Sequence, residues 1–272
     1  MNASRERFGG ALHIETYKGI NYKRVNGRSL QLDLHLPPAA KGKIPLVFYV
    51  HGGGWSSVTK EDTVNLEAFI GEGYAVSAMD YRYSNEARFP AQIEDVKAAL
   101  RWLRAHAGEF NLDPERIVVW GHSAGAHLAA LLALTGESRV FDTGDHLDVS
   151  SKVLAAGCVS PPVDLFDMGA QENAKEMIAA LLGGSPAEKK ELAELANPLS
   201  HVKKGDVPPF LFVHGDMDDI VPLRHSQKLH ELLVKNGLSS RLVVQPGIGH
   251  ANFNHPDMVR ELIQFFRPYL KG

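Results

Sequence analysis

The sequence predicts an α/β fold: one domain built on a doubly wound, mostly parallel central sheet of about eight strands with helices on both faces. Strand-like apolar runs alternate with helical patterns along the chain, which is the order typical of such sheets. Most of these runs are almost continuously apolar, as expected of strands that are buried on both faces. The 272 residues are a length that a single α/β domain can reach.

The expected strands are of two kinds. Near the N-terminus lie Leu12–Tyr17 and Ser29–Leu36, and the second alternates leucines with polar residues. That period of two predicts a half-buried, antiparallel strand, so the front of the sheet should be antiparallel and the whole sheet mixed. The nearly continuous runs are Leu46–Val50, Tyr74–Met79, Ile117–Trp120, Val153–Val159, Phe210–Val213 and Arg241–Gln245.

Helical spacing fills most of the segments between these strands. Pro90 is expected to begin one helix, because proline suits the first helical position. Other helices are expected at Ser123–Leu134, Leu223–Lys235 and Pro256–Tyr269. Residues 163–200 hold two helical stretches, Glu172–Leu182 and Pro186–Leu195, and no expected strand. We interpret this segment of the 1–272 domain as a small helical insertion, either a lid or a surface excursion that gates nothing.

Composition excludes several classes of function. The net charge is −3 and no basic run stands out, so nothing supports nucleic-acid binding. Cys158 is the single cysteine, so no intrachain disulfide can form. The N-terminus has no apolar run behind its charges, and no stretch approaches the roughly 18 apolar residues of a membrane span. We therefore expect a cytoplasmic protein without a membrane span.

The strongest motif is Gly-His-Ser-Ala-Gly at residues 121–125, between an apolar strand and a helix rich in alanine and leucine. This G-x-S-x-G context is typical of a nucleophile elbow, where a serine on a tight strand-to-helix turn is exposed above the sheet. The flanking residues must be small because the turn is crowded. The motif therefore predicts Ser123 as a catalytic nucleophile.

A second motif, His-Gly-Gly-Gly-Trp, occupies residues 51–55 directly after an expected strand. A glycine-rich loop there can bring backbone N–H groups close to the oxyanion of an acyl-transfer reaction. Gly53 and Gly54 are the candidate donors from this loop, together with the Ala124 N–H. His51 is expected to brace the loop. Trp55 and His122 are candidate pocket residues.

A serine needs a base, and His250 is the best placed of the 13 histidines. It follows the last expected strand, so it should lie at the same carboxyl edge of the sheet as Ser123. His122 and His127 are too close to Ser123 in sequence to reach its hydroxyl from the required side. His214 ends a strand and is expected to brace a turn.

The base needs a carboxylate partner, and three aspartates follow the strand at Phe210–Val213. Asp216 comes early in that loop and suits a role in loop hydrogen bonding. Asp218 and Asp219 lie further out, and physical reasoning does not separate them. The chain order of serine, aspartate and histidine is the order expected of this site.

These motifs, with residues 111–117 and 214–222, resemble the bacterial esterases of the feruloyl-esterase-like and hormone-sensitive-lipase-like groups, over about residues 25–270. The resemblance implies an α/β-hydrolase fold. Its H-G-x-x-D-x-x-V-P pattern puts the triad acid at Asp218. It also implies that Arg82, in an Asp-Tyr-Arg-Tyr segment, pairs with a buried carboxylate. The H-G-G-x-W pattern is also similar to that of kynurenine formamidases.

Together these features predict a carboxylic-ester hydrolase that acts on short-chain acyl or small aryl esters through an acyl-enzyme, with amide or formamide hydrolysis as the alternative. The triad needs no cofactor, and no metal-ligand spacing is present. The partner is a small-molecule ester, and the protein is expected to be a monomer or homodimer. Apolar insertion residues are expected either to wall a short pocket or to pack as a helix face; they are Phe166, Met168, Met177, Ile178, Leu181 and Leu182.

Overall fold

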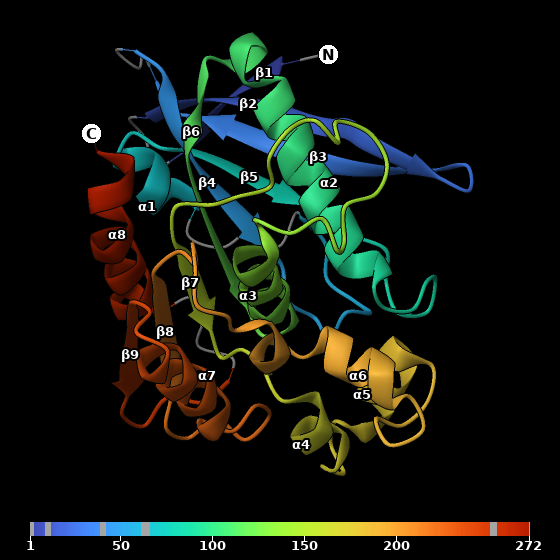
Figure 1. Cartoon of the computed structure of the whole chain (residues 1–272). Helices are drawn as coiled ribbons and strands as arrows, with labels where there is room; N and C mark the ends of the chain where they lie inside the picture. Colours follow the sequence, from blue (N-terminus) through green and yellow to red (C-terminus); the bar gives the residue numbers. More distant parts are fainter. Residues whose placement is uncertain (1–2, 9–11, 39–41, 61–65, 251–254, 272) are drawn as a thin grey trace.

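The computed structural model describes residues 3–8, 12–38, 42–60, 66–250 and 255–271, and over these residues nine strands form one mixed sheet (Figure 1). The strands are β1 (Ala3–Phe8), β2 (Leu12–Val25), β3 (Arg28–Leu36), β4 (Ile44–Val50), β5 (Ala75–Met79), β6 (Leu112–His122), β7 (Ala156–Val159), β8 (Phe210–Gly215) and β9 (Ser240–Gln245). Their order across the sheet is β1-β2-β3-β5-β4-β6-β7-β8-β9. The neighbouring pairs β1–β2, β2–β3 and β3–β5 are antiparallel. The remaining pairs, β5–β4, β4–β6, β6–β7, β7–β8 and β8–β9, are parallel.

The sheet confirms the predicted α/β class and corrects its front edge. Strand β1 was not expected, because its sequence Ala-Ser-Arg-Glu-Arg-Phe has no apolar periodicity; it exists through its backbone pairing with β2. Strand β2 also continues past the expected end at Tyr17. Its register against β3 shifts between Tyr17 and Ile20 and again between Asn21 and Lys23. Such irregularities interrupt the period of two in the side-chain pattern by which a strand is predicted from sequence.

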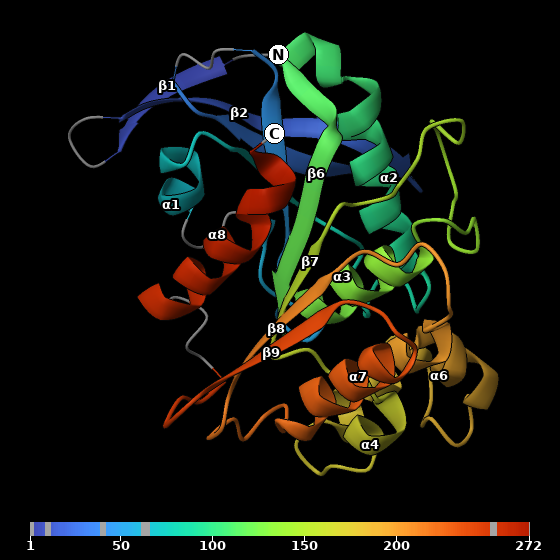
Figure 2. The same ribbon diagram turned by 60° about the vertical axis from the view of Figure 1, so that its left-hand side comes forward.

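Helices cover both faces of the sheet (Figure 2). The helices are α1 (Leu66–Gly71), α2 (Ala91–Ala105), α3 (Ala124–Thr135), α4 (Leu165–Gly169), α5 (Lys175–Leu182), α6 (Lys190–Ala196), α7 (Arg224–Lys235) and α8 (Pro256–Leu270), with 3-10 turns η2 (Ala107–Phe110) and η3 (Pro198–His201). Strand β4 serves both layers. Its Leu46, Phe48 and Val50 belong to the buried cluster that includes residues of α2, α3 and α7, whereas Val47 and Tyr49 belong to the cluster that includes residues of α1 and α8. This double burial explains why β4 is apolar throughout.

Residues 163–200 form α4, α5, α6 and η3, which gather beside the N-terminal end of α3 (Figure 1). Several bonds connect them to the body of the domain. The Asp164 carboxylate accepts from Lys228 of α7 at 2.8 Å, and the Phe89 N–H donates to the Leu181 carbonyl at 2.9 Å. Ile178 and Leu181 are fully buried in the core. These two residues therefore pack as an ordinary helix face rather than wall a pocket.

Arg82 was expected to pair with a buried carboxylate, and its partner in the structure is Asp95 on α2, whose side chain is fully buried. The Arg82 guanidinium donates to both carboxylate oxygens, at 2.8 and 3.0 Å, and Lys23 adds a third charged hydrogen bond at 2.7 Å. The pair connects the segment after β5 to α2. Within the described part of the chain, no helix is long and apolar enough to cross a membrane.

Candidate active site

Ser123 occupies the turn between β6 and α3 in a strained conformation, with φ 55° and ψ −123°. Non-glycine residues rarely adopt such a positive φ, and strain of this kind gathers at functional sites. The flanking glycines make the turn possible. A Cβ at Gly121 would lie 2.5 Å from the carbonyl carbon of Gly125, and a Cβ at Gly125 would lie 2.5 Å from the carbonyl oxygen of His51. The motif therefore needs glycine at both positions.

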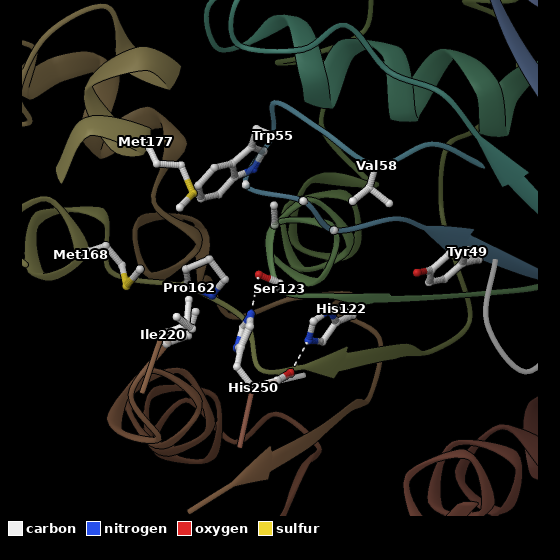
Figure 3. A pocket seen from close by; sticks show the side chains of 15 residues that line it. Tyr49, Trp55, Val58, His122, Ser123, Pro162, Met168, Met177, Ile220 and His250 are labelled. Atoms are coloured by element: carbon white, nitrogen blue, oxygen red, sulfur yellow. Dashed lines mark hydrogen bonds between the residues drawn. The ribbon is translucent and has the colours of Figure 1, made fainter. Parts of the chain in front are cut away.

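The structure brings Ser123, His250 and Asp218 into hydrogen-bonding contact, and Figure 3 shows the contact between Ser123 and His250. Nε2 of His250 lies 3.0 Å from Ser123 Oγ, and Nδ1 of the same ring lies 2.8 Å from Asp218 Oδ2. The three residues follow β6, β8 and β9, whose carboxyl ends share one edge of the sheet. This geometry suits a nucleophile, a base and a carboxylate that orients the base.

Among the three aspartates after β8, the one in contact with His250 is Asp218. Its side chain is fully buried, and its Oδ1 accepts the backbone N–H groups of Ile220 and Val221 at 3.1 and 2.8 Å. Burial alone would raise the pKa of this carboxyl, but hydrogen bonds from His214 and His250 hold its pKa well below the usual range. Asp219 is exposed, and Asp216 accepts the N–H of Gly247 as a loop contact.

His122 contacts the base from the elbow itself. Its Nε2 donates to the backbone carbonyl of His250 at 3.0 Å, and the two rings lie 4.8 Å apart. Burial, together with the neighbouring charge of His250, lowers the pKa of His122 to about 3. The ring is therefore uncharged at neutral pH. His122 holds the loop of the base, a role that its place inside the motif did not reveal.

The glycine-rich loop after β4 uses the conformational freedom of glycine at two positions. Gly53 and Gly54 have φ +87° and +59°, and the Gly53 carbonyl accepts the N–H groups of residues 56 and 57 at 3.1 Å. The Tyr81 hydroxyl donates to the carbonyl oxygens of His51 and Gly52 at 3.0 Å, and its ring stacks on His51. Nδ1 of His51 lies 3.0 Å from the Gly52 carbonyl oxygen, so His51 braces the loop by hydrogen bonding as expected. Tyr81 is a second brace that sequence reasoning missed.

Two buried hydrogen bonds through His127 connect this loop to α3 and to the insertion at residues 163–200. The Trp55 indole N–H donates to Nδ1 of His127 at 3.2 Å, and Nε2 of His127 donates to the Ala196 carbonyl at 2.7 Å. Burial lowers the pKa of His127 to about 4, which keeps the ring neutral and able to accept from Trp55. Ala124 begins α3, where the first N–H groups of a helix have no intrahelical acceptor.

A cavity of about 310 Å³ opens at Ser123. Its lining comprises Tyr49, Gly52, Gly53, Gly54, Trp55, Val58, His122, Ser123, Ala124, Pro162, Met168, Met177, Ile220, Val221 and His250. Trp55 and His122 thus lie where they were expected. Of the apolar insertion residues, Met168 and Met177 reach the cavity. The two methionines, with Pro162 and Ile220, lie on the far side of Ser123 from Tyr49 (Figure 3).

The cavity wall is apolar. Among the described residues, no lysine, arginine, aspartate or glutamate lines it. Met177 packs closely on the glycine-rich loop, since a Cβ at Gly54 would lie 2.5 Å from its sulfur. Most of the wall comes from loops after different strands, so its composition was not predictable from any one motif. The arrangement suits a small uncharged group beside the serine.

Comparison with known proteins gives a consistent result. The model of the BD-FAE family matches residues 32–233. The chain is 32% identical over 211 residues to the probable carboxylic ester hydrolase LipM of Mycobacterium tuberculosis, over 74% of this chain and 48% of LipM. It is 29% identical to the esterase LipQ of the same organism, over 86% of this chain and 56% of LipQ. The chain thus spans about half the length of the curated relatives it matches.

Solved structures match over almost the whole chain. A truncated carbohydrate esterase from gut microbiota superposes with a TM-score of 0.84 at 28% identity, covering 94% of this chain and 96% of that one. The esterase Est2 of Thermogutta terrifontis superposes with a TM-score of 0.78 at 27% identity, over 92% of each chain. Est2 also has structures with propionate or butyrate bound and one phosphorylated by paraoxon, with TM-scores of 0.76, 0.78 and 0.78. The fold is that of the α/β-hydrolases.

Proposed function

This chain belongs to the BD-FAE family of α/β-hydrolases, and we propose that it is a carboxylic-ester hydrolase with Ser123 as nucleophile, His250 as base and Asp218 as the triad acid. The observation that carries the proposal is the chain of contacts from Ser123 Oγ through His250 to Asp218, at 3.0 and 2.8 Å, at the floor of an apolar cavity. The esterase relatives support the same chemistry.

The reaction follows from these contacts. His250 Nε2 takes the hydroxyl proton of Ser123 as Oγ attacks the ester carbonyl. The oxyanion accepts N–H groups from Gly53 or Gly54 and from Ala124. The tetrahedral intermediate then expels the alcohol, which takes the proton back from His250, and Ser123 keeps the acyl group. Water attacks the acyl-enzyme with His250 again as base, and the carboxylic acid leaves.

The substrate class follows from the cavity. A chain gains roughly 0.8 kcal/mol for each methylene it buries, but only where an apolar wall receives it. The 310 Å³ volume, with Met168 and Met177 across one end, favours an uncharged acyl group of about two to six carbons or a small aryl acid. The relative Est2 holds propionate and butyrate, which supports this size.

We infer further that residues 163–200 act as a fixed wall rather than a moving lid. The Phe89 N–H donates to the Leu181 carbonyl at 2.9 Å, and the Asn173 amide donates to the Asp219 carbonyl at 3.1 Å. The Ala196 carbonyl accepts from His127 within the core. A lid would have to break these contacts at each opening, with buried polar groups left unpaired.

A substrate panel tests the proposal. We expect kcat/KM to be highest for p-nitrophenyl esters of two to six carbons and to fall beyond roughly eight, where further methylenes are no longer buried. A hemisuccinate ester should react more slowly than a butyrate ester, because no lysine or arginine of the described residues lines the cavity to pair with its carboxylate. A rate that rose to sixteen carbons would contradict the size argument, and faster cleavage of N-formylkynurenine than of any ester would favour formamide hydrolysis.

A further inference from the structure

The triad acid touches a second histidine besides the base. His214 is the fifth residue of β8 and lies four residues before Asp218. Its Nε2 lies 3.2 Å from Asp218 Oδ2, the same oxygen that accepts from His250 Nδ1 at 2.8 Å. The side chains of His214 and Asp218 are both fully buried. The carboxylate is therefore held between two imidazoles.

The orientation of His214 is fixed at both ring nitrogens. Nε2 faces two acceptors, the Val221 carbonyl at 2.7 Å and the Asp218 carboxylate, so this nitrogen carries the hydrogen. Nδ1 lies 2.7 Å from the Ser226 hydroxyl of α7, which can donate to it. An imidazole held in this way presents its N–H to the carboxylate without losing further rotational freedom.

His214 also completes a closed set of contacts around the acid. The backbone of Val221 donates its N–H to Asp218 Oδ1 at 2.8 Å and accepts from His214 through its carbonyl. Removal of the His214 donor would therefore release one side of the residue whose N–H holds Oδ1 and leave a buried carbonyl unpaired. Both oxygens of the acid depend on the same histidine, one directly and one through Val221.

We propose that His214 is a positioning residue for the triad: it fixes Asp218 toward His250 and shares the charge of the carboxylate. The inference rests on the proposed hydrolase function, and it goes beyond the turn-bracing role expected for this residue. Two further histidines contact the acid and the base: His214 lies against Asp218, and His122 lies against His250. Loss of the N–H from His214 would direct more of the carboxylate charge onto His250, so protonated His250 would persist to higher pH.

The matched variants His214→Gln and His214→Asn test the proposal. The amide of glutamine can reach the position of Nε2, whereas the shorter asparagine reaches only that of Nδ1. His214→Asn should lose about tenfold or more in kcat, as for one hydrogen bond to a charged group. Its KM should be almost unchanged, and the acid limb of its pH profile should move to higher pH. His214→Gln should recover most of the wild-type rate and profile.

His35→Asn is the control for loss of a buried histidine, because His35 bonds to Thr16 on the far part of the sheet. It should leave the pH profile unchanged. A folded His214→Asn variant with wild-type kcat and pH profile would overturn the proposal, as would equal losses in the asparagine and glutamine variants. His214→Met replaces asparagine if that variant does not fold. If neither folds while His214→Gln does, the histidine is structural only and the proposal fails. An inactive wild-type protein would instead refute the hydrolase function.

Discussion

A single methyl group at Gly125 should displace the nucleophile. Gly125 is the second residue of α3, and its Cα faces the backbone of β4. A Cβ there would lie 2.5 Å from the His51 carbonyl oxygen and nearer still to that of Val50, whereas Cβ atoms essentially never approach such atoms within 3.0 Å. Because both neighbours are backbone atoms, one in the last residue of β4 and one in the residue after it, no side-chain rotation relieves the contact.

Gly125→Ala must therefore move the start of α3 away from β4 by about 1 Å, against a close-packed interior. Overpacking of this kind costs about 1–3 kcal/mol of unfolding free energy. A displacement of about 1 Å in a reacting group can lower the rate about a hundredfold. We expect both effects: a lower midpoint in urea denaturation, and a loss of kcat/KM for p-nitrophenyl butyrate of about two powers of ten.

Gly108→Ala is the matched control. Gly108 lies in η2 on the surface, and nothing lies within 4 Å of a Cβ built on it. This variant should keep the stability and activity of the wild-type protein. Wild-type stability and turnover in Gly125→Ala would refute the argument that close contact with β4 sets the position of Ser123.

Two further results follow from the same geometry. Asp218→Asn should lower kcat by about four powers of ten, as for loss of a triad acid, and Asp219→Asn should change it only slightly; the reverse ranking, by ester assay, would move the acid to Asp219. The free energy of unfolding should decrease as pH falls from 6.5 toward 4, because burial lowers the pKa of His127 and of His225 to about 4. The unfolded chain takes up these protons first, so each ring contributes a slope of about 1.4 kcal/mol per pH unit in that range. Urea denaturation at a series of pH values gives the unfolding free energy as a function of pH. This dependence on pH should be less steep for His127→Gln than for the wild-type protein, and an unchanged dependence would contradict the argument.

The class of fold was predictable because its central strands are buried on both faces. Apolar runs such as Phe210–Val213 are conspicuous in the sequence, and their alternation with helices indicates a parallel sheet. The front edge was less predictable. Strand β1 has a charged sequence and depends on its pairing with β2, and a sequence pattern does not report a pairing between backbones.

The candidate site was predictable where topology sets it. Each of its three motifs follows a strand, and parallel strands bring their carboxyl ends to one edge. The choice between Asp218 and Asp219 came from family resemblance, because two neighbours in a loop have the same chemistry. Burial separates them in the structure: Asp218 turns inward to His250, whereas Asp219 is exposed. Their roles in catalysis stay predictions.

Other parts of the site depend on packing between distant segments. Tyr81 holds the glycine-rich loop by donating to the His51 carbonyl oxygen. His214 holds the triad acid through its contacts with the Val221 carbonyl and the Asp218 carboxylate. No local spacing identifies such contacts. Met168 and Met177 were expected either to wall the pocket or to pack in the core. Both line the cavity, and Met168 also belongs to the buried core, whereas Ile178 is buried in the core and does not line the cavity. The sequence pattern is the same for both outcomes, because each is an apolar residue in a helical stretch.

Covalent labelling of Ser123 tests the central claim most directly. Paraoxon transfers a diethyl phosphoryl group to an activated serine and releases p-nitrophenol, and the adduct can be located by mass spectrometry of the digested protein. We expect one adduct per chain, on the peptide that contains Ser123, with loss of esterase activity in proportion to labelling. Ser123→Ala should take no label and have no measurable turnover. Inhibition with the adduct on another residue, or an active Ser123→Ala variant that keeps its fold, would contradict the assignment.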